Sequence, residues 1–211
     1  MLKKITLLVA AAALVLVLMG CEEDDDFTAM SQAEWTTEGW KAWEAGDYDG
    51  AITLFGNALK VDPYYAEAQC GLGWTYLRMQ NISVAIETLE SAVLVSEQVG
   101  TELKVRQSIY MGVATAYQAN DDYDVSAERA LFMINNLQGQ NFTFIGDSRV
   151  TGYDVYILLA LNYYGMGNAN RCVWAVNKMR GMIGESQNYE FTDWRAMTAE
   201  IERLIGRDPS V

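Results

Sequence analysis

The stretch Trp35–Pro63, WTTEGWKAWEAGDYDGAITLFGNALKVDP, decides the fold of this chain of 211 residues. Several of its residues recur 34 positions later: Gly39 is followed by Gly73, and Ala51-Ile52 by Ala85-Ile86. Self-similarity at a fixed period indicates a repeat architecture. The recurring glycine and alanine are small, so they let neighbouring helices approach closely. Because the chain has two prolines and a weak strand signal, we expect the repeats to be helical.

This stretch resembles a tetratricopeptide repeat. With Gln32 as position 1 of a 34-residue repeat, the signature positions 4, 8, 20, 24, 27 and 32 hold Trp35, Gly39, Ala51, Phe55, Ala58 and Pro63. Positions 7 and 11 hold Glu38 and Ala42 in place of the usual leucine and tyrosine. A second repeat over Ala66–Val99 restores both, with Leu72 and Tyr76.

Two further repeats resemble the family less closely. The turn Asp121-Asp122-Tyr123-Asp124 resembles the turn of repeat one, which puts position 1 of repeat three at Gln107. This register predicts a lengthened first helix with Thr101 as its N-cap. Repeat four runs from about Tyr153 to Gly184, after a non-periodic insert at 139–150.

A last helix is predicted over Trp194–Ile205, with Thr192 or Asp193 as its N-cap. Its outer face is expected to be polar, as in the end caps of solenoids, and to carry Glu200, Glu202, Arg203 and Arg207. The resemblance thus implies an all-α fold: a right-handed superhelix of about four helix-turn-helix repeats over 32–206, with a C-terminal capping helix and a short tail at 207–211.

The N-terminal residues have the features of an export signal. Lys3 and Lys4 precede an apolar run, Ile5–Met19, that is shorter than the roughly 20 residues of a membrane span. The run leads into Leu18-Met19-Gly20-Cys21, which resembles the lipobox of bacterial lipoproteins. This resemblance implies that residues 1–20 are removed and that lipid on Cys21 holds the protein on a membrane. The alternative is an ordinary secretory signal with a chance cysteine.

Residues 21–31 are expected to form a linker. Glu22–Asp26 are five consecutive acids, which repel one another and keep the domain away from anionic headgroups. In lipoproteins, the residues after the cysteine also direct sorting, and this sequence leaves the choice between inner and outer membrane open. We expect a place in the bacterial cell envelope and favour the outer membrane, on its periplasmic face or its surface.

Charge and residue usage exclude several functions. Fifteen Lys and Arg against 28 Asp and Glu give a net charge of −13, which argues against a nucleic-acid partner. Histidine is absent, which excludes histidine-dependent catalysis and histidine-ligated zinc. The sequence has no phosphate-binding loop or CxxC pair, and its aspartate-rich turns lack the features of an EF-hand loop. We therefore expect no catalytic residue, metal or cofactor; an enzyme would have to use carboxylates alone.

Cys70 and Cys172 fall in repeats two and four. Because packed helices lie about 8–10 Å apart, the two residues are expected about 20 Å from each other. A disulfide needs Cα atoms within about 7 Å. We interpret both cysteines as small buried residues.

The resemblance also predicts a binding groove. In tetratricopeptide superhelices, positions 2, 5, 9, 12 and 13 of the first helix of each repeat line the concave face. Carried over, these positions supply the candidate partner-binding residues Trp40, Trp43, Trp74, Leu77, Arg78, Met111, Leu161 and Tyr164. Thr115, Ala119 and Asp154 fall on the same face. Trp, Tyr and Arg are frequent anchors of protein interfaces, so we expect an envelope protein or peptide to bind there.

Two other interpretations of the tryptophans remain open. In the first, they serve as platforms for sugar rings, which would make the protein a glycan- or small-ligand-binding lipoprotein. They can also fill the interior of the superhelix, packed against the N-terminal segment or the last helix. The leading interpretation is an interaction scaffold in the cell envelope.

Overall fold

The computed structural model describes residues 30–208. The described helices lie in one compact unit that begins at Gln32. The predicted signal peptide at 1–20, the lipidation site at Cys21 and the acidic run Glu22–Asp26 lie outside the described residues. They therefore stay predictions.

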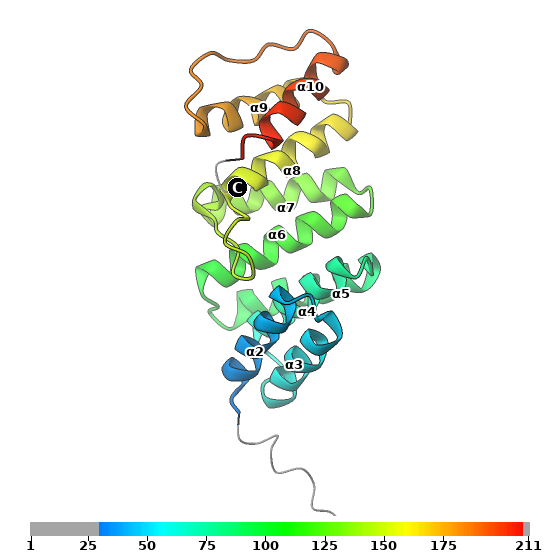
Figure 1. Cartoon of the computed structure of the whole chain (residues 1–211), viewed down its shortest axis with the longest axis vertical. Helices are drawn as coiled ribbons and strands as arrows, with labels where there is room; N and C mark the ends of the chain where they lie inside the picture. The colour runs from blue at the N-terminus through cyan, green and yellow to red at the C-terminus, as the bar shows by residue number, and fades with distance from the viewer. Residues whose placement is uncertain (1–29, 209–211) are drawn as a thin grey trace, which may run out of the picture. The chain divides into compact units, whose positions relative to one another are not determined.

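The described part of the chain is an array of α-helices stacked in order along the sequence (Figure 1). The helices are α2 (Gln32–Glu44), α3 (Tyr48–Val61), α4 (Ala66–Arg78), α5 (Ile82–Gln98), α6 (Leu103–Ala119), α7 (Tyr123–Asn136), α8 (Gly152–Gly165), α9 (Ala169–Met182) and α10 (Trp194–Ile205). A short 3-10 helix, η2 (Gly139–Asn141), follows α7. Within 30–208, no helix has the length and apolar character needed to cross a bilayer.

The helices pair as the sequence predicts, so the all-α repeat fold is confirmed. Helix α10 spans Trp194–Ile205, and the Asp193 side chain caps it by accepting a hydrogen bond from the backbone N–H of Ala196. The prediction of Thr101 as the N-cap of the third pair is wrong. Helix α6 begins at Leu103, and Glu102, whose extended backbone precedes the first helical residue, takes the N-cap position.

Small residues allow the two helices of each pair to pack closely. A Cβ atom on Gly39 would lie 2.6 Å from the Phe55 ring, and one on Gly73 would lie 2.4 Å from Leu89. In repeats three and four, position 20 also supplies a donor to the partner helix. The Ser126 hydroxyl donates to the Ala114 carbonyl at 2.6 Å, and the Cys172 thiol to the Ala160 carbonyl at 3.4 Å. These contacts explain why position 20 stays small.

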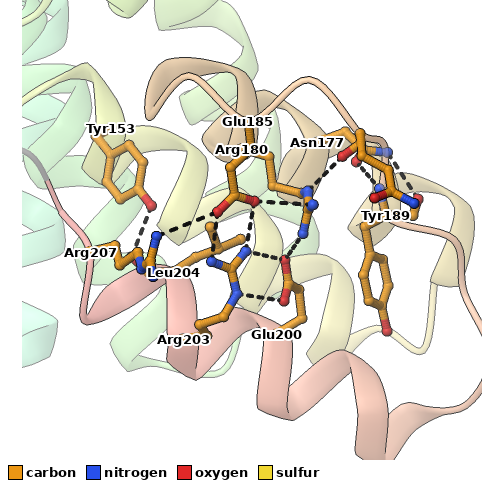
Figure 2. A network of polar contacts seen from close by, with 10 residues as sticks. Tyr153, Asn177, Arg180, Glu185, Tyr189, Glu200, Arg203, Leu204 and Arg207 are labelled. Atoms are coloured by element: carbon orange, nitrogen blue, oxygen red, sulfur yellow. Dashed lines mark hydrogen bonds and ion pairs between the residues drawn. The ribbon is translucent and has the colours of Figure 1, made fainter.

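A network of ion pairs fastens α10 to α9 and to the loop between them (Figure 2). Arg203 donates two hydrogen bonds to Glu185, at 2.8 and 2.9 Å, and also bonds Glu200. Arg180 on α9 pairs with both carboxylates. Of the residues expected on a polar outer face, Glu202 and Arg207 are exposed, whereas Glu200 and Arg203 are drawn into this network. The Glu200 side chain is 11% exposed because the two arginines enclose it.

Candidate functional site

The non-periodic insert folds into a hairpin that reaches from the start of α8 towards α6 (Figure 1, yellow-green). We call residues 142–151 the insert hairpin. Thr143 and Thr151 form an isolated antiparallel bridge, and the Phe144 N–H donates to the Val150 carbonyl at 2.9 Å. The Val150 N–H donates to the Asp147 carbonyl, which closes the tip.

Phe144 lies among the three tryptophans that the sequence places in the groove. Its ring centroid lies 4.4 Å from that of Trp74, 5.6 Å from that of Trp40 and 5.9 Å from that of Trp43. Aromatic pairs at these separations are favourable beyond the area that they bury. Trp40, Trp43 and Trp74 are 8%, 5% and 7% exposed, and Phe144 is 2% exposed. We call the three tryptophans, Trp40, Trp43 and Trp74, the tryptophan cage.

The hydrogen-bonding groups of the cage are unequally satisfied. The Trp40 indole N–H donates to the Glu67 carboxylate at 3.1 Å, and the Trp74 indole N–H to the Ser108 carbonyl at 3.0 Å. Burial raises the pKa of Glu67, and the hydrogen bond from Trp40 acts in the opposite direction. The Trp43 indole N–H has no acceptor among the described residues, although it is buried. The Arg78 guanidinium lies over the Trp43 ring, 4.9 Å from its centroid.

Gly146 allows the tip of the hairpin to pack closely against Trp40. A Cβ atom at this position would lie 2.6 Å from Trp40 and 2.8 Å from the Phe144 ring. Such distances are too short for any side chain, so the close fit of the tip depends on glycine.

The tryptophans are largely buried rather than exposed along a groove, although Trp74 lines the cavity described below. The insert hairpin packs against them, and their small exposed fractions leave little indole surface for stacking on a sugar ring. The interpretation of the tryptophans as interior packing is nearest to the structure, but the covering segment is the insert and not the N-terminal segment or the last helix. The signal in the sequence was the pair Phe142 and Phe144, the two aromatic residues of the insert at 139–150.

The other candidate groove residues have different surroundings. Met111 is buried, Leu77 and Leu161 are half-buried, and Arg78 is exposed. Tyr164 packs edge-on against Trp194 of α10, with ring centroids 5.2 Å apart, and its hydroxyl accepts a hydrogen bond from Thr198 at 2.9 Å. The capping helix therefore engages Tyr164, and the structure does not bring it together with the tryptophan cage.

Part of the concave face stays open beside the hairpin. A cavity of about 690 Å³ lies between α4, α6 and the first turn of α8, and its lining includes Trp74, Leu77, Arg78, Met111, Thr115, Ala119 and Val150. We call it the groove cavity. Asp154 also lines it, but its carboxylate accepts a hydrogen bond from the Thr151 backbone N–H at 2.7 Å. The cavity is thus mainly apolar, with Arg78 as its exposed charge.

The remaining candidate chemistry is structural. Cys70 and Cys172 are free and fully buried, and burial raises the pKa of the Cys172 thiol to about 11 and that of Cys70 well above its ordinary value. Asp47 caps α3 by accepting from the Gly50 N–H. Asp121 accepts a hydrogen bond from the Tyr123 hydroxyl at 2.6 Å. No cluster of metal-ligating side chains occurs in the part of the chain that the structure describes.

Comparison with known proteins agrees with this architecture. The tetratricopeptide repeat family model matches residues 42–98. No curated protein matches the chain. Residues 42–98 therefore contain tetratricopeptide repeat sequence, and the described helices have the corresponding all-α repeat fold.

Solved structures extend the likeness over most of the chain. The MamA protein is 21% identical with a TM-score of 0.54, and the match covers 84% of this chain and 89% of MamA. Pseudomonas aeruginosa PilF is 13% identical with a TM-score of 0.61, covering 84% of this chain and 69% of PilF. A tetratricopeptide repeat protein from Parabacteroides merdae is 14% identical with a TM-score of 0.56, covering 85% and 62%. At these identities the likeness establishes the fold alone.

Proposed function

We propose that this protein is a membrane-anchored interaction scaffold of the bacterial cell envelope, which binds a protein partner through the groove cavity. The observation that carries the proposal is the cavity itself. Leu77 and Met111 come from equivalent first helices of successive repeats, and with Val150 they form an apolar surface on the concave face. Apolar concave surfaces with few polar groups are typical of binding sites.

Charge supports a protein partner over an acidic polymer. The described residues contain far more acidic than basic side chains, whereas the groove cavity offers Arg78 beside apolar groups. A peptide segment with apolar residues and a carboxylate matches this combination. The three indole rings that a sugar would need are at most 8% exposed, so we do not propose glycan binding at the cage.

A paired substitution tests binding at the groove cavity. Ala119 is exposed and lines the cavity, so Ala119→Arg fills it without burying new volume in the core. Ala199, exposed on α10 away from the cavity, provides the matched control Ala199→Arg. Partners that co-purify with the wild-type protein should be lost from the Ala119→Arg variant and kept by the control. Equal recovery from both variants would contradict binding in the cavity.

A separate experiment tests whether lipid on Cys21 anchors the protein to a membrane. Lipid on Cys21 would hold the domain on a membrane, with the acidic residues after it as a spacer. We favour the outer membrane. In cell fractionation, the wild-type protein should follow the outer membrane, and Cys21→Ser should move to the soluble fraction or stay uncleaved. An unchanged distribution and mass of the Cys21→Ser variant would contradict lipid anchoring.

A further inference from the structure

The insert hairpin lies beside the cavity where we propose that a partner binds, and it presents its own side chains to the concave face. We infer that the hairpin is an internal occupant of a peptide-binding groove, and that the partner is an extended segment of matching chemistry that displaces it. That segment carries an aromatic residue, a small residue two positions later and an acidic residue directly after it. The inference rests on the proposed function and names the chemistry of the partner.

The hairpin itself displays this pattern as Phe144, Gly146 and Asp147. Phe144 packs among the three tryptophans, and position 146 lies so close to Trp40 that it accommodates only glycine. Asp147 lines a second cavity, of about 370 Å³, together with Gly146 and Arg78. The pKa of Asp147 is lowered, first by the hydrogen bond from Arg149 and further by the charge of Arg78. Each of the three residues thus contacts a different part of the concave face.

Polar contacts hold the tip to the helices only weakly. The hydrogen bonds of Phe144, Val150 and Arg149 stay within the hairpin. Among the described residues, the hydrogen bond from the Ile145 N–H to the Ser108 hydroxyl is the one that links 143–150 to a helix, and it is long, at 3.3 Å. Attachment of the tip therefore depends on apolar contacts, in which Ile145 and Val150 pack against the core beside the Phe144 ring. A competing aromatic side chain would replace the contact of that ring.

The cage also has a donor that the hairpin does not use. The indole N–H groups of Trp40 and Trp74 are paired, but that of Trp43 is not, although Trp43 is 5% exposed. Buried donors without an acceptor are rare in folded proteins. An extended segment that places a backbone carbonyl at the Trp43 indole N–H would satisfy this donor. A partner thus gains an interaction that the hairpin lacks.

A peptide-binding experiment tests the inference. The probe is the blocked peptide QNFTFIGDSRVTG, which corresponds to residues 140–152. The hosts are the full-length wild-type protein and its Phe144→Ala variant, with binding followed by tryptophan fluorescence. The peptide should bind the variant at least about tenfold more tightly than the wild type, in which the hairpin occupies the cage for most of the time. Peptides with alanine in place of Phe144 or Asp147 should bind the variant more weakly.

The inference would be overturned if the folded Phe144→Ala variant does not bind the peptide, or if it binds the native and the alanine peptides with equal affinity. If Phe144→Ala does not fold, hydrogen exchange of the wild-type protein decides. The amides of Phe144 and Val150 should exchange through a local opening, well ahead of those in α4 and α6. If the hairpin amides exchange together with those of α4 and α6, the hairpin is a fixed part of the core and the inference is wrong.

The outcomes separate the inference from the proposed function. Ala119→Arg probes the groove cavity and leaves Phe144 in its cage. If this variant loses its partner and the peptide experiment fails, the proposed scaffold function is supported, and the inference that a partner displaces the hairpin is wrong. Peptide binding with no effect of Ala119→Arg on the partner would reject partner binding in the groove cavity.

Discussion

The ring of Phe144 stacks at a tilt on that of Trp74, 4.4 Å away between centroids, although 70 residues separate them in the chain. This contact joins the insert before the fourth repeat to the first helix of the second repeat. Local repeat packing alone does not make such a link, because each repeat in a solenoid contacts mainly its neighbours. The insert therefore adds a long-range connection to a fold of otherwise short-range contacts.

Removing the Phe144 ring should weaken the domain. The ring is 2% exposed and contacts three tryptophans, so Phe144→Ala should lower the free energy of unfolding by about 3 kcal/mol. Urea denaturation followed by circular dichroism measures the change. Arg149→Ala at the exposed tip of the same hairpin serves as the control and should stay within about 0.5 kcal/mol of the wild type. Equal effects of the two substitutions would contradict the packing described for Phe144.

Two glycine substitutions should have opposite effects. Gly146→Ala places a Cβ atom 2.6 Å from Trp40 and should destabilise the protein by about 1–3 kcal/mol. Gly56→Ala lies within α3, where nothing is within 4 Å of the added atom, and should stabilise by about 0.5–1 kcal/mol. The same denaturation experiment compares them. A stabilised Gly146→Ala variant would mean that the hairpin does not lie under Trp40.

The attachment of the capping helix should depend on pH. The hydrogen bond from Arg203, supported by Arg180, lowers the pKa of Glu200 below its ordinary value of 4.5. Because the folded-state pKa lies below the unfolded one, the folded protein binds fewer protons, and stability rises with pH across this window. The contribution is complete above about pH 4.5 and is lost as the pH falls through the folded-state pKa.

Glu200→Gln tests this dependence. It should cost about 2 kcal/mol at pH 7, where the carboxylate is ionised and accepts charged hydrogen bonds, and much less in acid. Denaturation curves from pH 3 to pH 7 measure the difference. A cost that does not change with pH would argue against an ionised Glu200 in the network.

Thiol labelling should distinguish the three cysteines. Thiolates are the reactive form, and the pKa values of the Cys70 and Cys172 thiols are raised, so in the folded protein both should react with iodoacetamide at pH 8 at least about 100-fold more slowly than in urea. Under the lipoprotein proposal, protein taken from cell membranes should label two thiols in urea, because the Cys21 sulfur carries lipid. Three labelled thiols in urea would contradict lipidation, which mass spectrometry detects directly.

Much of the fold could be predicted from the sequence because repeats encode their packing locally. The 34-residue spacing located the helix pairs, and α10 begins and ends where the pattern of capping and apolar residues predicts. The network around Glu200 and Arg203 was harder to predict. An arginine and a glutamate on one helix look solvated until another segment, here the loop with Glu185, encloses them.

The covering of the tryptophans by the insert hairpin could not be predicted from the repeat spacing. Repeat positions indicate that Trp40, Trp43 and Trp74 share the concave face, but they do not indicate what covers that face. The covering segment is an insert with no periodicity, and its placement depends on a contact between residues far apart in the chain. Phe144 and Gly146 carry this information, yet an aromatic residue and a glycine are ordinary in any turn.

The most direct test of the account is photo-crosslinking in living cells from position 77. Leu77 lines the groove cavity, whereas Lys60 is exposed on α3, and a photo-reactive residue at each position gives a matched pair. The account predicts one dominant envelope protein bound from position 77, absent from position 60 and lost when Ala119→Arg fills the cavity. Adducts that are the same from both positions, or none from position 77 in a folded and membrane-bound protein, would contradict a partner in the groove.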